Sequence, residues 1–212
     1  MKYKNLLFDW SGTLVDDLPP TLHATNEVLL NYGVPAMDRE EFRRRFRLPY
    51  PEFYEEVLPG VPVNDLEVIF RSSFNQSPVR VVVLPHAREM LAWCRENKVR
   101  CFVLSSMDVG LFTEQAHDFG LHDHFEAIYA GVIDKRHRIG DILSDHGLEL
   151  AKTAFVGDMV HDIETARHGG VDSIAVATGY DPVARLTGTD PSHIFDHLGD
   201  FRDWLEQSRR PS

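Results

Sequence analysis

The sequence has few cysteines, a deficit of basic residues and no long apolar run. Its two cysteines, Cys94 and Cys101, stand in apolar surroundings without metal-ligand spacing, which suits a reducing compartment and no disulfide framework. The 22 basic residues against 33 acidic ones give a formal charge of −11, which argues against a nucleic-acid or anionic-membrane surface. No apolar stretch approaches the roughly 20 residues of a membrane span, and the opening Met-Lys-Tyr-Lys leads into a strand rather than a signal peptide. We therefore expect a soluble, cytoplasmic protein that is a monomer or a homodimer.

The chain has 212 residues and 43% hydrophobic content, enough for one core domain and a smaller second unit. From residue 80 onward, beginning with the apolar run 81–83, short apolar runs alternate with segments of helical periodicity. This alternation predicts an α/β fold with a parallel sheet, right-handed crossovers and a Rossmann-like three-layer core. The predicted strands cover residues 6–8, 99–105, 126–131, 153–157, 173–178 and 193–195, and the predicted helices cover 86–96, 109–119, 139–146, 163–168 and 198–207.

Residues 17–79 differ from the rest, with helical periodicity, proline breaks and charge but no strand pattern. Helices are expected over 22–30, 39–47, 53–58 and 65–74, the second of them capped by Asp38. Each helix alone is too short to be stable, so we expect the bundle to pack on itself and over the mouth of the core. The predicted division is a core domain of residues 1–16 and 80–212, with a helical cap domain of residues 17–79 inserted after the first strand.

Asp9 is the residue around which the chain is organised. It follows the apolar run Leu6-Leu7-Phe8 and precedes a turn at Gly12. Ligands of open α/β sheets bind beyond the carboxyl ends of strands, where this carboxylate is expected to lie. An isolated Asp before a turn is more often a turn former. Asp9 is not isolated, because polar residues follow two other predicted strands: Ser105-Ser106 and Asp158.

Further polar residues are expected at the same edge of the sheet. The segment Gly157-Asp158-Met159-Val160-His161-Asp162 places two carboxylates four residues apart, so that one can bind a hard cation and the other can support it. Lys135 precedes a helix in a chain with little lysine and can reach this edge. Together these groups would form an electrostatic clamp for phosphoryl chemistry with Mg²⁺. The plainer alternatives are that Ser106 caps the following helix and that Lys135 is a surface lysine.

These residues resemble the motifs of the haloacid dehalogenase-like hydrolase superfamily, in the subgroup with a helical cap inserted after the first motif. The family's first motif, Asp-x-Asp-Gly-Thr, corresponds to Asp9-Trp10-Ser11-Gly12-Thr13, and its second, an apolar strand ending in Ser or Thr, corresponds to the run ending at Ser105. The third-motif lysine resembles Lys135, and Gly-Asp-x-x-x-Asp matches Gly157-Asp158 and Asp162. The resemblance covers the whole chain, with the motifs in the family's order.

The resemblance implies a role for each of these residues. Asp9 would attack phosphorus and form an aspartyl-phosphate, Ser105 would hydrogen-bond the phosphoryl group, and Lys135 would neutralise its charge. Mg²⁺ would be held by Asp9, the backbone carbonyl of Ser11 and Asp158, with Asp162 orienting these ligands. The phosphate would be bound in a nest of backbone amides formed by the first-motif turn and the second-motif residue that follows the strand. The substrate-binding residues at this nest would be Trp10, Gly12, Thr13 and Ser106.

Ser11 departs from the family pattern. Phosphatases of the family carry a second Asp there, which protonates the leaving alkoxide and later activates water, and losing such help typically removes about 10² to 10⁴-fold in rate. Asp-Trp-Ser-Gly-Thr is close to the phosphonoacetaldehyde hydrolase form of the motif, but that chemistry needs a cap lysine, and no lysine lies between Lys4 and Lys98. A dehalogenase dispenses with the metal and would not be expected to keep Asp158 and Asp162.

The leading hypothesis is therefore a Mg²⁺-dependent phosphatase of the phosphoglycolate phosphatase type that acts on a small phosphorylated metabolite. It would be slow on alkyl esters unless a neighbour such as His161 replaces the missing acid, whereas an acyl or aryl phosphate would need no acid for the first step. The alternatives are a hydrolase of a C–P or other non-ester bond, and a weakened member that binds Mg²⁺ and a phosphorylated ligand without turnover. Arginine pairs with phosphate or carboxylate in a bidentate fork, but the arginines of residues 39–47 fit better with a solvated helix face balanced by Glu40 and Glu41. The exception singled out for substrate recognition is Arg47, which adjoins the break at Leu48-Pro49.

Overall fold

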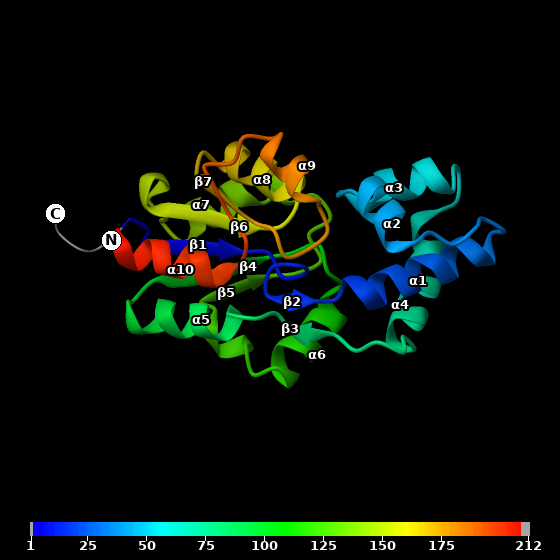
Figure 1. The fold of residues 1–212 in the computed structure, drawn as a ribbon, viewed down its shortest axis with the longest axis horizontal. Helices are drawn as coiled ribbons and strands as arrows, with labels where there is room; N and C mark the ends of the chain where they lie inside the picture. The colour runs from blue at the N-terminus through cyan, green and yellow to red at the C-terminus, as the bar shows by residue number, and fades with distance from the viewer. Residues whose placement is uncertain (1, 209–212) are drawn as a thin grey trace.

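The computed structural model describes residues 2–208, which form an α/β fold around a six-stranded parallel sheet (Figure 1). The strand order is β5-β4-β1-β6-β7-β8, so the strand that delivers Asp9 lies in the middle of the sheet. The predicted fold class is confirmed, and two strands, β6 and β8, have the predicted bounds. The strands are β1 (Asn5–Phe8), β4 (Arg100–Leu104), β5 (Ala127–Tyr129), β6 (Thr153–Gly157), β7 (Asp172–Val176) and β8 (His193–Phe195).

Helices cover both faces of the sheet and complete the three layers (Figure 1). One face packs against α5 (Ala87–Glu96), α6 (Val109–Asp118) and α10 (Leu198–Gln207). The other packs against α7 (Ile139–Asp145) and α8 (Val160–Gly169), and α9 (Val183–Thr187) packs beside α8. Three short 3₁₀ segments connect these elements: η1 (His122–His124), η2 (Lys135–His137) and η3 (Leu150–Lys152).

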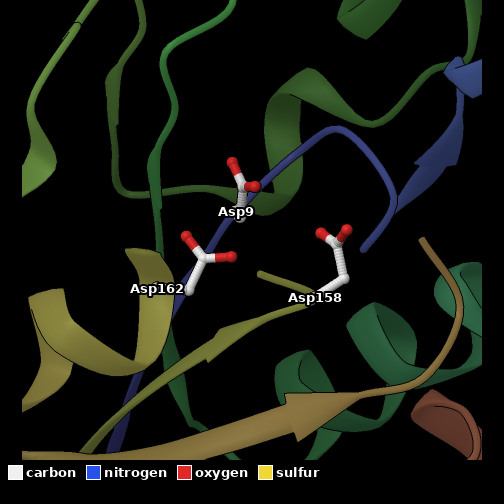
Figure 2. Close-up of side chains that lie close together, drawn as sticks. All are labelled: Asp9, Asp158 and Asp162. Carbon is white, nitrogen blue, oxygen red and sulfur yellow. The ribbon is translucent and has the colours of Figure 1, made fainter. Parts of the chain in front are cut away.

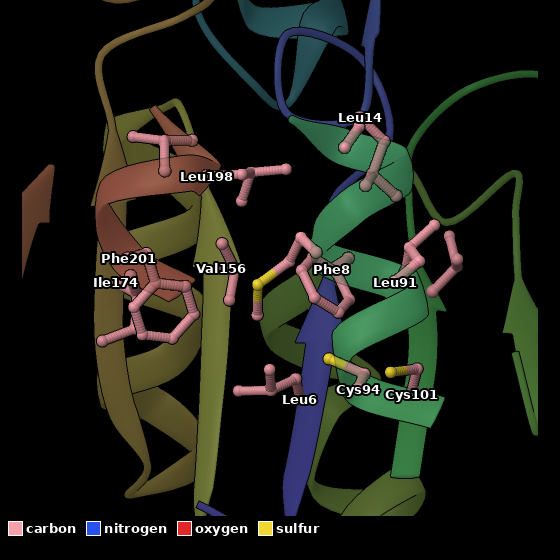
Figure 3. Packing of buried hydrophobic residues seen from close by; sticks show 14 of the residues in the cluster. Leu6, Phe8, Leu14, Leu91, Cys94, Cys101, Val156, Ile174, Leu198 and Phe201 are labelled. Carbon is pink, nitrogen blue, oxygen red and sulfur yellow. The ribbon is translucent and has the colours of Figure 1, made fainter. Parts of the chain in front are cut away.

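The core follows the two-residue alternation of side chains along β1. Leu6 and Phe8 point to the α5 and α10 side, where Figure 3 shows them between Cys94 and Val156. Leu7 points to the opposite face and packs in the α7 and α8 cluster. Successive residues of a strand face opposite sides, so a strand buried on both faces is apolar throughout. This burial fixes β1 and therefore the position of the carboxylate that follows it.

The insertion between β2 (Val15–Asp16) and β3 (Val82–Val83) is helical, as predicted. These two strands pair antiparallel in a small separate sheet, so the apolar run at 81–83 does not join the main sheet. The helices between them are α1 (Leu18–Asn31), α2 (Arg39–Arg45), α3 (Tyr50–Val57) and α4 (Val63–Asn75).

The cap helices form their own apolar cluster, which extends to Met159 and Tyr180 on the core. Asp38 caps α2 as predicted, since its side chain accepts a hydrogen bond from the Glu41 amide at 2.7 Å. α1 begins earlier than predicted, because proline is tolerated in the first turn of a helix. The domain boundaries remain a prediction, and residues 1 and 209–212 of the predicted core lie outside the described residues. None of the helices within residues 2–208 is long and apolar enough to cross a membrane.

Candidate active site

Three carboxylates meet at the carboxyl edge of the sheet (Figure 2). Asp9 follows β1, Asp158 follows β6, and Asp162 lies in the first turn of α8. One oxygen from each lies within 4.8 Å of the others, and their residues are 3%, 0% and 2% exposed. The structure therefore brings together the three acidic residues that the sequence assigned to a metal site.

Lys135 lies against this cluster from η2. Its Nζ is 2.8 Å from Asp9 Oδ1 and 2.7 Å from Asp162 Oδ1, and the residue is fully buried. Burial alone would lower the pKa of Lys135, but the carboxylates of Asp162 and Asp9 more than offset this and raise it. Lys135 is thus a buried ammonium rather than a surface lysine.

The cluster holds more acidic than basic groups. Burial raises the pKa of Asp9 to about 6, although Lys135 lowers it in part. Burial and the repulsion from Asp162 and Asp9 also raise the pKa of Asp158. Among the described residues, one ammonium thus faces three buried carboxyl groups, which resist ionising together. A hard divalent cation takes carboxylate oxygens as ligands and would supply the missing positive charge, so these residues fit Mg²⁺.

Asp158 is held by groups from two other loops. Its Oδ1 accepts a hydrogen bond from Thr13 Oγ1 at 2.9 Å, and its Oδ2 accepts one from the Tyr180 amide at 2.7 Å. Gly12 packs so closely that an added Cβ would lie 2.4 Å from Asp158 Oδ2, and its φ is +74°. Glycine is needed at this turn both for its backbone conformation and for the close approach. Contact of Thr13 with phosphate stays a prediction.

Asp162 joins the lysine to the start of α8. Its Oδ2 accepts a hydrogen bond from the Met159 amide at 3.0 Å while its Oδ1 faces Lys135. This acceptor starts α8 at Val160, earlier than the predicted residue 163. His161 Nε2 accepts a hydrogen bond from the Lys135 amide at 3.2 Å, and burial lowers the pKa of His161 to about 4. His161 is therefore neutral at pH 7 and engaged with the lysine loop.

Ser11 has a partner that the sequence did not reveal. Its Oγ donates a hydrogen bond to Asp17 Oδ2 at 2.6 Å, and Asp17 Oδ1 accepts one from the Tyr180 hydroxyl at 2.8 Å. Burial raises the pKa of Asp17 to about 7, with the two hydrogen bonds lowering it in part. Asp17 stands directly after Asp16 at the predicted cap boundary, and nothing in the local sequence distinguishes the two.

A cavity of about 380 Å³ lies between the cap and the core, and Asp9, Ser11 and Ser106 line it. Ser105 is buried, and its Oγ accepts a hydrogen bond from the Met107 amide at 3.2 Å. His161 does not line this cavity; it lines a smaller one of about 180 Å³, together with Arg47.

The side chains of two predicted substrate-binding residues have structural partners. The Trp10 ring lies in the core, where its Nε1 donates to Gln115 Oε1 at 2.9 Å, so only the Trp10 backbone can face a ligand. Arg47 forms an ion pair with Glu56 on the cap. The assignment of Arg47 to substrate recognition stays a prediction.

Comparison with known proteins agrees with this geometry. A family model described as Haloacid dehalogenase-like hydrolase matches residues 6–176. A phosphoglycolate phosphatase from Synechococcus elongatus is 23% identical over 212 residues, which cover 97% of this chain and 98% of the relative. A 5'-nucleotidase from Pseudomonas aeruginosa is 24% identical over 218 residues, covering 97% of both chains. The solved structure of a haloacid dehalogenase-like family hydrolase from Streptococcus pneumoniae superimposes with a TM-score of 0.84 at 21% identity, covering 96% of this chain and 99% of that one.

Proposed function

Because the chain belongs to the haloacid dehalogenase-like hydrolase family, we propose that it is a Mg²⁺-dependent phosphatase that forms an aspartyl-phosphate on Asp9. Its substrate would be a small phosphorylated metabolite. The observation that carries this proposal is the buried cluster of Asp9, Asp158 and Asp162 around Lys135. Relatives of similar identity bear the names of different phosphatases, which supports the reaction class more than any one substrate.

In this proposal Mg²⁺ would be held by Asp9, Asp158 and the backbone carbonyl of Ser11, while Asp162 would orient these ligands. The ion would supply positive charge that lets a carboxylate approach a phosphate dianion. Lys135 holds one oxygen of Asp9 at 2.8 Å and would neutralise a non-bridging phosphate oxygen.

The remaining residues of the site would bind the phosphoryl group. Ser105 and the amides around Trp10, Gly12, Thr13 and Ser106 are the proposed hydrogen-bond donors to it. The Asp9 carboxylate attacks phosphorus while the bond from phosphorus to the ester oxygen breaks, and the leaving group takes up a proton. Water then cleaves the aspartyl-phosphate, which returns the carboxylate and releases phosphate.

Phosphate release tests this proposal. The native protein is expected to hydrolyse at least one member of a panel of alkyl, aryl and acyl phosphates in a Mg²⁺-dependent reaction. Asp9→Asn is expected to abolish turnover, and Asp118→Asn, which changes an exposed carboxylate on α6, is expected to retain it. Turnover that survives Asp9→Asn would contradict the proposal.

Ser11→Asp, which restores the family's acid, separates an enzyme from a binding protein. If only this variant turns over substrate, the native chain binds its phosphorylated ligand without hydrolysing it. Retained native activity would instead show that Ser11 is compatible with hydrolysis.

A further inference from the structure

The cavity in front of Asp9 is large and mainly apolar. On the cap side its wall is made of aromatic and aliphatic side chains: Phe46, Leu48, Tyr54, Leu66, Phe70 and Phe74. An apolar cavity of about 150 Å³ is enough to hold benzene, whereas this cavity measures about 380 Å³. It has room for a phosphate group and at least one ring. With a two-carbon leaving group such as glycolate, most of the apolar wall of the cavity would stay in contact with water.

The charges that line the cavity disfavour an anionic leaving group. Among the described lining residues, four are acidic (Asp9, Asp17, Glu67 and Asp108), with the pKa of Asp17 raised to about 7, and one, Arg71, carries a cation. Arg71 forms an ion pair with Asp108, so its charge is already matched. Glu67 accepts a hydrogen bond from the Tyr50 hydroxyl. A substrate carboxylate would therefore lose water and meet carboxylates without gaining an unpaired cation.

Ser11 adds a chemical constraint on the bond that breaks. Its hydroxyl donates to Asp17 Oδ2 at 2.6 Å, and a serine hydroxyl cannot protonate an alkoxide at neutral pH. An aryl ester departs as a phenolate, whose conjugate acid resembles the tyrosine side chain with a pKa of about 10. Such a leaving group needs far less help from an acid than an alkoxide does.

We infer that the substrates are aryl phosphate monoesters, with an uncharged aromatic ring in the cavity between cap and core; this inference rests on the proposed function. In the first step an Asp9 oxygen forms a bond to phosphorus while the bond from phosphorus to the aryl oxygen breaks. The phenolate leaves and takes a proton from water. In the second step water cleaves the aspartyl-phosphate, which returns the Asp9 carboxylate and releases phosphate.

Three substrates separate the effect of the ring from the effect of the leaving group. Phenyl and cyclohexyl phosphate have rings of similar size but differ in leaving group, and phosphoglycolate carries the carboxylate. With Mg²⁺, kcat/KM for phenyl phosphate is expected to exceed kcat/KM for cyclohexyl phosphate by about 10²-fold or more. It is also expected to exceed kcat/KM for phosphoglycolate by at least about tenfold. Equal values for the two ring esters, or a preference for phosphoglycolate, would overturn the inference while leaving the phosphatase proposal standing.

Binding of non-hydrolysable analogues gives a readout without turnover. Calorimetry with Mg²⁺ should show benzylphosphonate binding at least about tenfold more tightly than 3-phosphonopropionate, which has a carboxymethyl group in place of the ring. The reverse order would overturn the inference. Tight benzylphosphonate binding with no hydrolysis of any ester would instead overturn the proposed function.

A charge placed in the cavity tests where the leaving group binds. Ile133 lines the cavity and is 43% exposed, so Ile133→Arg adds a cation there with little risk to folding. Ile194, which is 38% exposed on β8 and does not line the cavity, provides the matched control Ile194→Arg. Ile133→Arg is expected to shift the ratio of kcat/KM values toward phosphoglycolate by at least about tenfold, and Ile194→Arg to leave the ratio unchanged. The same ratio in both variants would overturn the inference.

Discussion

Replacing Lys135 by methionine tests the buried carboxylate cluster directly. Methionine keeps most of the apolar stem and removes the ammonium that lies 2.8 Å from Asp9 and 2.7 Å from Asp162. Breaking a buried ion pair by removing one partner costs about 3–5 kcal/mol, because an uncompensated charge stays behind. For a chain of this size, each kcal/mol lowers the melting temperature by about 2–4 °C, so we expect a decrease of about 6–20 °C at pH 8 without Mg²⁺.

The expected loss depends on pH. Burial raises the pKa of Asp9 to about 6 even beside Lys135, and without the ammonium this pKa rises further. At pH 5, Asp9 is therefore protonated in the Lys135→Met variant, and its carboxyl group is buried without a charge. The difference in free energy of unfolding between native protein and variant should accordingly be smaller at pH 5 than at pH 8.

Urea and thermal unfolding, followed by circular dichroism at both pH values, would measure these differences. Lys4→Met is the matched control, because it removes an exposed ion pair with Glu149 at 3.7 Å, which contributes about 0–1 kcal/mol. If Lys135→Met lost no more stability at pH 8 than Lys4→Met, the buried cluster would not hold charge as described.

Three further perturbations test the surroundings of the cluster. Gly12→Ala should lower the urea midpoint of unfolding more than Gly33→Ala does. Both glycines have φ of +74°, but an added Cβ would lie 2.4 Å from Asp158 at Gly12 and would meet no atom within 4 Å at Gly33. Equal decreases in the midpoint would contradict the close approach of Gly12 to Asp158. Mg²⁺ at 100 times its Kd should stabilise the native protein by about 2.7 kcal/mol. Thermal unfolding should show that Asp158→Asn abolishes this stabilisation. Stabilisation by Mg²⁺ that persists in Asp158→Asn would place the ion elsewhere. Burial raises the pKa of Asp17 to about 7 from about 3.9 in the unfolded chain, so native stability falls as pH rises between these values, by up to about 1.4 kcal/mol per pH unit. Asp17→Asn should flatten the stability profile measured by urea unfolding, and an unchanged slope would contradict the assigned shift.

The strand ends that carry the site could be predicted because their signals are local. The run 153–157 is apolar and ends at a glycine, and it forms β6 with those bounds. Burial on both faces of a central strand requires such a run, so Asp158 could be placed at its end. The same reasoning placed Asp9 after β1 and gave the parallel arrangement that brings the two together.

Other features depend on contacts between distant parts of the chain. Asp17 meets Tyr180 across 163 residues of sequence, and no periodicity indicates that pairing. The run 81–83 has the composition of a core strand, but it pairs with β2 outside the main sheet. α9 (Val183–Thr187) was not predicted, because five residues are too few for a helical period to emerge.

The narrow ribbon of β2 and β3 makes the insertion structurally separable from the main sheet. Val15 pairs with Val83 and Asp16 with Val82, so the chain leaves the core for the helical insertion and returns at nearly the same point. Paired residues in such a ribbon lie about 4.5–5.5 Å apart, a gap that a tight turn can close. The insertion is thus an appendage whose loss or exchange would leave the path of β1 intact. Exchanging the insertion would therefore change the part that lines the cavity and leave the strands that carry Asp9 and Asp158 in place.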